Sequence, residues 1–212
     1  MYNLPYFKAN NHGEVIEFMH QHPFIILSGV DADNKPVATH VPILFEEKED
    51  KLFFVGHIMK QTDHHKAFEK NDNVLAIFTG PHTYVSASWY SNQKQASTWN
   101  YLTVHAKGKL NFLGEGQLLS ILKRTTEKFE NNPASPSAFE ELPADYVQKL
   151  AKAIVAFEIE VIDIDDVFKL SQNRDKQSHE NIREKLKQGD ADSQQIAELM
   201  RSHNNELIND ED

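Results

Sequence analysis

Val155-Ala156-Phe157-Glu158-Ile159-Glu160-Val161 is the stretch that decides the fold class of this chain. Large apolar side chains stand at every second position, and small or acidic ones lie between them. This period of two is typical of a β-strand with one face in a core and the other towards solvent. The sequence therefore predicts a protein built mainly of β-structure.

Shorter apolar segments upstream have the length and composition of further strands. They are residues 24–29, 37–45, 51–56, 74–79, 83–90 and 99–112. The first three are joined by connections too short for a crossover helix, so they are expected to run antiparallel. Gly80-Pro81 is interpreted as a break between two strands, and Gly108 as the place of a bulge.

Helical patterns separate or follow these strands, and Thr62 or Asp63 is suited to cap one of them. The patterns cover residues 13–22, 63–70, 118–129, 146–150, 182–186 and 196–200. We therefore expect a six- or seven-stranded antiparallel barrel with helices packed outside it. The barrel domain is expected over residues 1–175, followed by a helical extension with an acidic tail over residues 176–212.

Composition restricts the classes of function. Acidic residues outnumber basic ones 32 to 22 in 212 residues, which gives a formal net charge of −10. A surface of that sign repels the phosphate backbone of DNA, so direct DNA binding is disfavoured. The chain has no cysteine, which excludes disulfides, thiolate nucleophiles and zinc sites built on sulfur. With no apolar stretch long enough to span a bilayer and no secretory pattern at the start, we expect a soluble, cytoplasmic protein.

Several common catalytic and nucleotide motifs are absent. Gly114-Glu115-Gly116 lacks the third glycine of a dinucleotide fingerprint, and no P-loop or Gly-x-Ser-x-Gly elbow occurs. The pair His179-Glu180 lacks the second histidine of a zinc protease motif, because Arg183 stands there. The eleven histidines include His64-His65, but no acidic spacing completes a metal site, so surface imidazoles are the favoured interpretation.

Residues 53–63 form the first candidate site, a passage from a strand to a helix. A phosphate monoester needs fixed N–H donors, such as those at a helix N-terminus, together with a cation. Gly56 would allow close approach of the backbone, while His57 and Lys60 would supply side-chain donors. A plain β–α turn with an exposed lysine fits the same residues, and on spacing alone it is the favoured interpretation.

Three further segments carry residues suited to a ligand. Thr39-His40-Val41-Pro42 puts a proline in a strand, which indicates an edge or a bend. Trp99-Asn100-Tyr101, with His105, would stack on a flat ring and hydrogen bond to its edge. Residues 169–174 are a polar run after a hydrophobic strand. Core packing, interface contacts and a capped loop are the alternatives for these three, and each stays open.

Taken together, these segments resemble the PaiB family of FMN-binding proteins, which are often labelled negative transcriptional regulators. The matching segments are Met1-Tyr2 with Phe7, residues 39–42, Gly56-His57, residues 80–86 and 88–90, Thr98-Trp99-Asn100-Tyr101 with Val104-His105, and residues 169–174. They occur in order over roughly residues 1–190.

The resemblance implies a split β-barrel related to the pyridoxamine-phosphate-oxidase-like flavoproteins, mainly β with peripheral helices. It also implies a homodimer with FMN at the subunit interface. The cofactor-binding residues implied are Thr39, His40, Val41, Pro42, Gly56, His57, Lys60, Trp99, Asn100, Gln172 and Arg174. His57 and Lys60 would contact the phosphate, and Lys60 stands where the family commonly has an arginine.

Three functions are compatible with these features. The first is an FMN-binding protein with a regulatory output, through a protein partner or a flavin-dependent state. The second is an FMN-dependent oxidoreductase, in which the flavin carries the reaction. The third is haem binding, which some split-barrel relatives perform through a histidine. Direct DNA binding is disfavoured because acidic residues interrupt the best basic region, residues 174–187.

Overall fold

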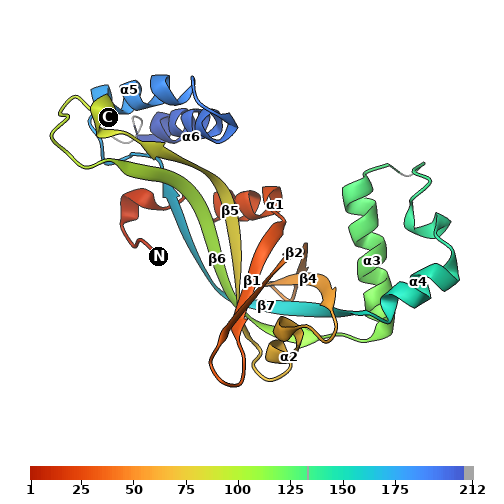
Figure 1. Cartoon of the computed structure of the whole chain (residues 1–212). Coiled ribbons are helices and arrows are strands. Elements are labelled where there is room, and N and C mark those ends of the chain that lie inside the picture. The colour runs from red at the N-terminus through yellow and green to blue at the C-terminus, as the bar shows by residue number, and fades with distance from the viewer. Residues whose placement is uncertain (133, 208–212) are drawn as a thin grey trace. The chain divides into compact units, whose positions relative to one another are not determined.

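The computed structural model describes residues 1–132 and 134–207 of the chain. Seven strands form one sheet in the order β2-β1-β5-β6-β7-β4-β3. Figure 1 shows β5 and β6 running beside each other as long arrows. The strands are β1 (Phe24–Val30), β2 (Pro36–Pro42), β3 (Leu44–Lys48), β4 (Lys51–Met59), β5 (Asn73–Val85), β6 (Thr98–Phe112) and β7 (Ile154–Lys169). Neighbours β1/β2, β1/β5, β3/β4 and β4/β7 pair antiparallel. The predicted antiparallel, seven-stranded arrangement is confirmed.

Helices are peripheral to this sheet, and all six helical patterns in the sequence are confirmed. The helices are α1 (His12–Gln21), α2 (Asp63–Phe68), α3 (Glu115–Glu130), α4 (Ala144–Ala151), α5 (Lys176–Leu186) and α6 (Ala191–Leu207). Short 3-10 turns occupy Pro5–Phe7, Ala87–Trp89 and Phe139–Glu141. Thr62 caps α2, because its Oγ1 accepts a hydrogen bond from the N–H of His65.

The chain divides into two compact units, each assembled from distant segments. Unit 1 comprises residues 1–21, 79–104 and 165–212, and unit 2 comprises residues 22–78 and 105–164. The long strands β5, β6 and β7 have residues in both units. The expected acidic tail, residues 209–212, lies outside the described residues. No helix of the described chain is long and apolar enough to cross a membrane.

Unit 2 is built on the alternating stretch of β7. Phe157 and Ile159 are buried, while Glu158 and Glu160 reach the surface side. Glu158 pairs with Lys48, and Glu160 lies 2.6 Å from the ammonium of Lys51. The alternation thus gives one apolar face, while the other face carries these ion pairs and, at Ala156, packs in the cluster with Leu118 and Ile121 of α3 (Glu115–Glu130). Exposed pairs of this kind contribute little to stability, so the apolar face determines the packing.

Unit 1 has a separate apolar core to which both ends of the chain contribute. Phe18 of α1 packs on Phe168 of β7, with ring centroids 5.3 Å apart. Ile182 of α5 and Ile196 and Met200 of α6 are fully buried. The weak apolar stripes of the C-terminal segment therefore belong to a core.

Several strand boundaries differ from the sequence predictions, among them the end of the predicted strand 83–90, since β5 ends at Val85 and a 3-10 turn follows. The predicted break at Gly80-Pro81 is wrong, since β5 runs from Asn73 through both residues to Val85. A Cβ on Gly80 would lie 2.6 Å from the ring of Phe18, so this glycine allows α1 to approach the strand. The predicted single strand over residues 37–45 is also wrong. It divides at Ile43, whose N–H donates to the carbonyl of Pro23.

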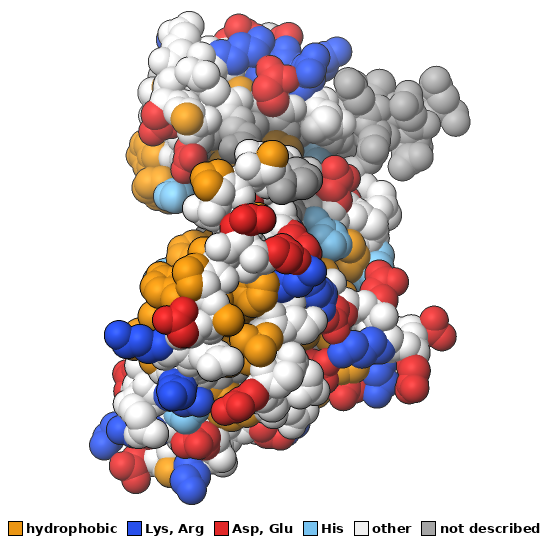
Figure 2. Space-filling model, turned by 90° about the vertical axis from the view of Figure 1, so that its right-hand side faces the viewer, with side chains coloured by type: hydrophobic (Ala, Val, Ile, Leu, Met, Phe, Trp, Pro, Cys, Tyr) orange, Lys and Arg blue, Asp and Glu red, His pale blue; other side chains and the backbone are white. Residues whose placement is uncertain are grey.

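The helices α3 and α4 of unit 2 leave part of their apolar surface exposed. Leu118 and Ile121 of α3 are buried against Leu44 and Val55, whereas no residue of α4 is buried. Figure 2, which views this side of the chain, shows hydrophobic side chains gathered among acidic and basic ones. Amphipathic helices with an open apolar face commonly contact further partners.

Candidate functional site

The first predicted segment lies in unit 2, at the end of β4. Gly56 and His57 belong to the strand and pair with Phe157 and Ala156 of β7. The predicted end of the strand at residue 56 is therefore wrong, and the bend follows at Lys60 and Gln61. Gln61 has a φ of 66°, in the left-handed region that few non-glycine residues adopt. Such a backbone position commonly marks a functional segment.

Gly56 connects this segment with the predicted residues of β2. A Cβ at position 56 would lie 2.8 Å from the ring of Phe157 and 3.0 Å from the carbonyl oxygen of Pro42. The close approach expected at Gly56 is therefore made by the protein itself. It brings the end of β2 against β4, so the two predicted segments of unit 2 meet.

His57 and Lys60 are available to a ligand. Neither side chain forms a hydrogen bond or ion pair with a residue of the described ranges. His57 is half-buried, and burial lowers its pKa from the ordinary value of 6.5. At neutral pH it is therefore an uncharged donor and acceptor, and Lys60 is the cation of this segment.

The start of α2 offers a phosphate fewer donors than the sequence suggested. Thr62 Oγ1 accepts the N–H of His65 at 3.3 Å, and Asp63 Oδ1 accepts the N–H of His64 at 2.8 Å. That backbone hydrogen bond lowers the pKa of Asp63, so a carboxylate stands where an anion would approach. Anion binding at this bend thus depends on the side chains of Lys60 and His57.

Neutral His57 gives a pH-dependent contribution to stability. Because the folded state resists its protonation, the unfolded state binds more protons below pH 6.5. The free energy of unfolding is expected to fall as the pH drops through 6.5 towards the lowered pKa, and burial shifts His22 and His179 in the same direction. The melting temperature, measured from about pH 7.5 to about pH 5, reports this loss of stability.

The variant His57→Gln should show a shallower fall in melting temperature over this range. The matched control is His12→Gln, at an exposed histidine that begins α1. Identical pH profiles for the His57 variant and the unmodified protein would contradict the assignment.

The β2 residues divide between two faces of their strand. Successive side chains alternate, so Thr39 and buried Val41 share one face while His40 and Pro42 share the other. His40 is exposed and stacks on Phe24, with centroids 6.0 Å apart. The four side chains therefore cannot all line one face of a ring. β2 is an edge strand, as its proline predicted.

The other predicted residues lie in unit 1. Trp99 is 52% exposed and contacts Tyr84 and His82, at centroid distances of 5.8 and 6.1 Å. These three aromatic rings form an exposed surface suited to stacking. Asn100 is fully buried, and its Oδ1 accepts a hydrogen bond from Ser171 at 3.0 Å. Asn100 therefore holds the turn after β7, and its role at a flavin edge stays a prediction.

That turn is rigid. Ser171 has a φ of 64°, and the side chain of Gln172 bonds the backbone of two residues that precede Ser171. The Gln172 amide donates to the carbonyl of Phe168 and accepts from the N–H of Leu170 at 2.7 Å. Arg174 follows, with its guanidinium 4.2 Å from the ring centre of Tyr90. The predicted segment 169–174 includes Lys169, but sequence reasoning did not single out this buried lysine. Its signal is a charge inside a hydrophobic strand.

Two other kinds of site find little support. Among residues 1–132 and 134–207, no group of three metal-ligating side chains occurs. The basic region near α5 is neutralised locally, since Lys187 lies 2.7 Å and Arg183 3.9 Å from Glu184. This is the geometry of a solvated helix face.

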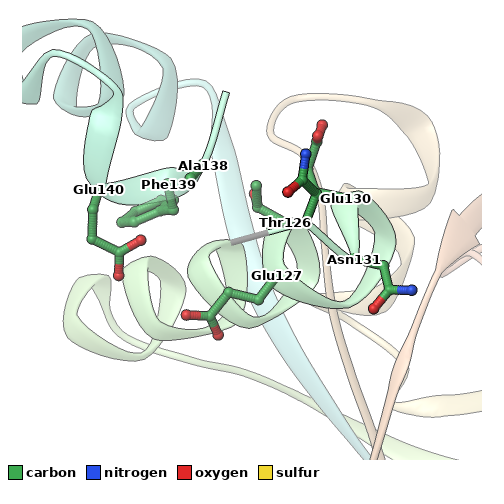
Figure 3. Close-up of a pocket in the computed structure, with 8 residues that line it drawn as sticks. Thr126, Glu127, Glu130, Asn131, Ala138, Phe139 and Glu140 are labelled. Carbon is green, nitrogen blue, oxygen red and sulfur yellow. The ribbon is translucent and has the colours of Figure 1, made fainter. Parts of the chain in front are cut away.

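A surface cavity of about 340 Å³ lies beside α3 and contains none of the predicted site residues. Figure 3 shows Glu127 and Glu130 of α3 on one wall and Phe139 and Glu140 opposite them. Three carboxylates would repel a phosphate, so this cavity does not fit FMN.

Comparisons with known proteins show the family of the chain. Residues 1–163 match the family described as "Putative FMN-binding domain". Over 201 residues the chain is 36% identical to "Protease synthase and sporulation protein PAI 2" of Bacillus subtilis, covering 94% of this chain and 96% of that protein. The chain belongs to the PaiB family. The cofactor of this family of FMN-binding domains is FMN. The contact of Lys60 and His57 with its phosphate stays a prediction.

Solved structures share the fold. The FAD and haem binding protein from Mycobacterium smegmatis superposes with a TM-score of 0.56 at 16% identity, covering 76% of this chain and 72% of that one. At this identity the likeness concerns the fold alone. The PaiB-family chain has the split β-barrel fold that the sequence predicted, with its helices at the periphery.

Proposed function

We propose that this protein is an FMN-binding regulator, which acts through a protein partner or through the redox state of its flavin. The observation that carries the proposal is the pair His57 and Lys60, which have no described partner, in a chain of the PaiB family. Bound FMN would supply one- and two-electron redox chemistry. The chain would bind its phosphate with Lys60 and His57.

The acidic surface supports an indirect regulatory role. A net charge of −10, with Arg183 and Lys187 both close to Glu184, opposes direct DNA binding. We further propose a cytoplasmic homodimer, as the family resemblance implies. Exposed Phe24 and Met59 of unit 2, 61% and 60% accessible, support an association surface.

Loss of the Lys60 charge is expected to weaken FMN binding. A charged hydrogen bond to phosphate contributes roughly 1.5–3 kcal/mol, so Lys60→Gln should raise the dissociation constant by about 10- to 100-fold. Quenching of flavin fluorescence measures it. Lys66→Gln, at an exposed lysine of α2, is the matched control and should bind like the unmodified protein. Absence of FMN binding by the unmodified protein would refute the proposed function.

Two measurements on the unmodified protein test the two other functions, oxidoreductase activity and haem binding. Bleaching of the bound flavin by NAD(P)H without oxygen would favour an FMN-dependent oxidoreductase. Haem is the second candidate cofactor, because the Mycobacterium smegmatis structure of this fold is of an FAD and haem binding protein. A Soret band on haem titration, with no flavin quenching, would favour it over FMN.

A further inference from the structure

The helices α3 and α4 of unit 2, with the 3-10 turn before α4, border a long surface groove. Three hollows of about 340, 380 and 260 Å³ lie along α3. The first and second share Phe139 and Glu140, and the second and third share Leu119 and Gln148. Because neighbouring hollows have walls in common, they are parts of one groove, which we call the α3–α4 groove.

Both helices contribute one stripe of side chains to the α3–α4 groove. From α3 these include Leu119, Lys123, Thr126, Glu127 and Glu130, and from α4 they are Ala144, Val147, Gln148 and Ala151. Members of each stripe recur at spacings of three or four, which places them on one helix face. At 1.5 Å per residue, the 16 residues of α3 give the groove a length of about 24 Å. A second helix of about four turns has the same length.

The middle of the α3–α4 groove is apolar and open. Its apolar lining consists of Leu119, Phe139, Leu142, Ala144 and Val147. Leu119 is 38% exposed, and no residue of α4 is buried. A helix of eight residues is marginal in water unless its apolar face is packed, so an occupant of the groove would also stabilise α4.

The end of the groove at the C-terminus of α3 is acidic. It is lined by Glu127, Glu130 and Glu140, and none of the described residues that line it is a lysine or arginine. Figure 3 shows Glu127 and Glu130 on α3 and Glu140 on the opposite wall. Lys123, from the middle of the groove, pairs with Glu140 and lies 3.7 Å from Glu127. One cation therefore faces three carboxylates, and the carbonyl end of α3 adds further negative potential.

This shape and charge select the kind of occupant. An apolar groove of one helix length accepts an amphipathic helix, which anchors through side chains three or four positions apart. The acidic end favours lysines or arginines at one end of that helix and opposes an anionic lipid surface. A second copy of this chain carries a net charge of −10, so it is a poorer match than a basic partner.

We propose that the α3–α4 groove binds a basic amphipathic helix of a protein partner. The inference rests on the proposed function in so far as that function acts through a protein partner. It does not depend on bound flavin, because the groove contains none of the residues predicted to contact FMN.

The test measures binding of three labelled synthetic peptides, each as long as α3, by fluorescence anisotropy at physiological ionic strength. The first has leucine at every third or fourth position and lysines clustered at one end. The second has glutamates in place of the lysines, and the third has the composition of the first in scrambled order. The scrambled peptide controls for general attraction between a basic peptide and an acidic protein.

Two variants of the full chain alter the groove. Leu119→Ser removes an apolar contact in its middle, and Glu130→Gln removes a charge at its acidic end. The matched controls are Leu150→Ser, at a 49% exposed leucine of α4 that lines none of the hollows, and Glu47→Gln, at an exposed glutamate of β3. Melting curves verify folding, and Glu130→Gln provides a second variant should Leu119→Ser unfold.

The basic amphipathic peptide should bind at least about 10-fold more tightly than the other two. Leu119→Ser should weaken that binding by about 10- to 100-fold and Glu130→Gln by up to about 5-fold, with both controls unchanged. Equal binding of the ordered and scrambled basic peptides, preference for the acidic peptide, or equal losses in the controls overturns the inference.

Other occupants would also overturn the inference, and each has its own signal. A change of sedimentation coefficient in Leu119→Ser alone would show that a second copy covers the groove. Vesicle binding that Leu119→Ser abolishes would show that lipid does. FMN quenching should be equal in all variants. Selective peptide binding by a chain that binds no FMN supports this inference and refutes the flavin assignment, whereas FMN binding without peptide selectivity does the reverse.

Discussion

Phe54→Ala is expected to be the most destabilising single substitution in unit 2. The Phe54 ring is fully buried on β4 and contacts Phe45 and Phe78, with centroids 5.2 and 5.4 Å away. Deleting a buried phenyl ring removes its transfer free energy and leaves a cavity, at a cost of roughly 3–5 kcal/mol. That loss is a large part of the stability of a typical domain, so the unfolded state should be populated on mild heating.

Chemical denaturation measures this loss, and Phe129→Ala supplies the control. Phe129 lies on α3 and is 50% exposed, so the same deletion there should change the free energy of unfolding by less than about 1 kcal/mol. Similar losses for both variants would show that the three-phenylalanine cluster does not determine the stability of unit 2.

Gly108→Ala is the second substitution with a large expected effect. A Cβ on Gly108 of β6 would lie 2.5 Å from both the carbonyl oxygen of Glu160 and Cγ2 of Ile159 on β7. A backbone oxygen inside a sheet cannot move aside, so the strands must separate. Overpacking of this kind costs about 1–3 kcal/mol, and we expect the upper end.

The control for this prediction is Gly116→Ala in α3, where an added Cβ meets nothing within 4 Å. Alanine favours a helix over glycine, so this variant should be as stable as the unmodified chain or more stable by up to about 1 kcal/mol. Denaturation curves of the two variants measure this difference in the free energy of unfolding. An unchanged midpoint for Gly108→Ala would mean that the strands lie further apart than the structure has them.

Hydrophobic periodicity predicted most of the fold, because a face that must be buried leaves a period in the sequence. The alternation of β7 and the stripe of α3 are examples. Glycine misled the prediction because it has two uses. At Gly80 it makes room for a neighbouring element, whereas the sequence suggested a break. Which use applies depends on contacts between residues far apart in the chain.

The candidate site could be predicted less well than the fold. The strand period alone indicates that Thr39 and His40 face opposite sides, so this feature was accessible from sequence. Two other features were not accessible from sequence. They are the occupied N–H donors at the start of α2 and, among the described residues, the lack of a counterion for Lys169. They depend on which acceptors the folded chain brings close, and a lysine with a counterion looks identical in sequence to one without.

The composition of unit 1 has a consequence for the order in which the protein can form during synthesis. Lys8 contacts Asp165, 157 positions away, and Phe18 packs on Phe168. The segment that contains Lys8 and α1 must therefore wait until Asp165 and Phe168 have been synthesised. Unit 2 can assemble once residue 164 has emerged. Contacts this distant slow folding, and α1 is the segment most exposed to misassociation in the interval.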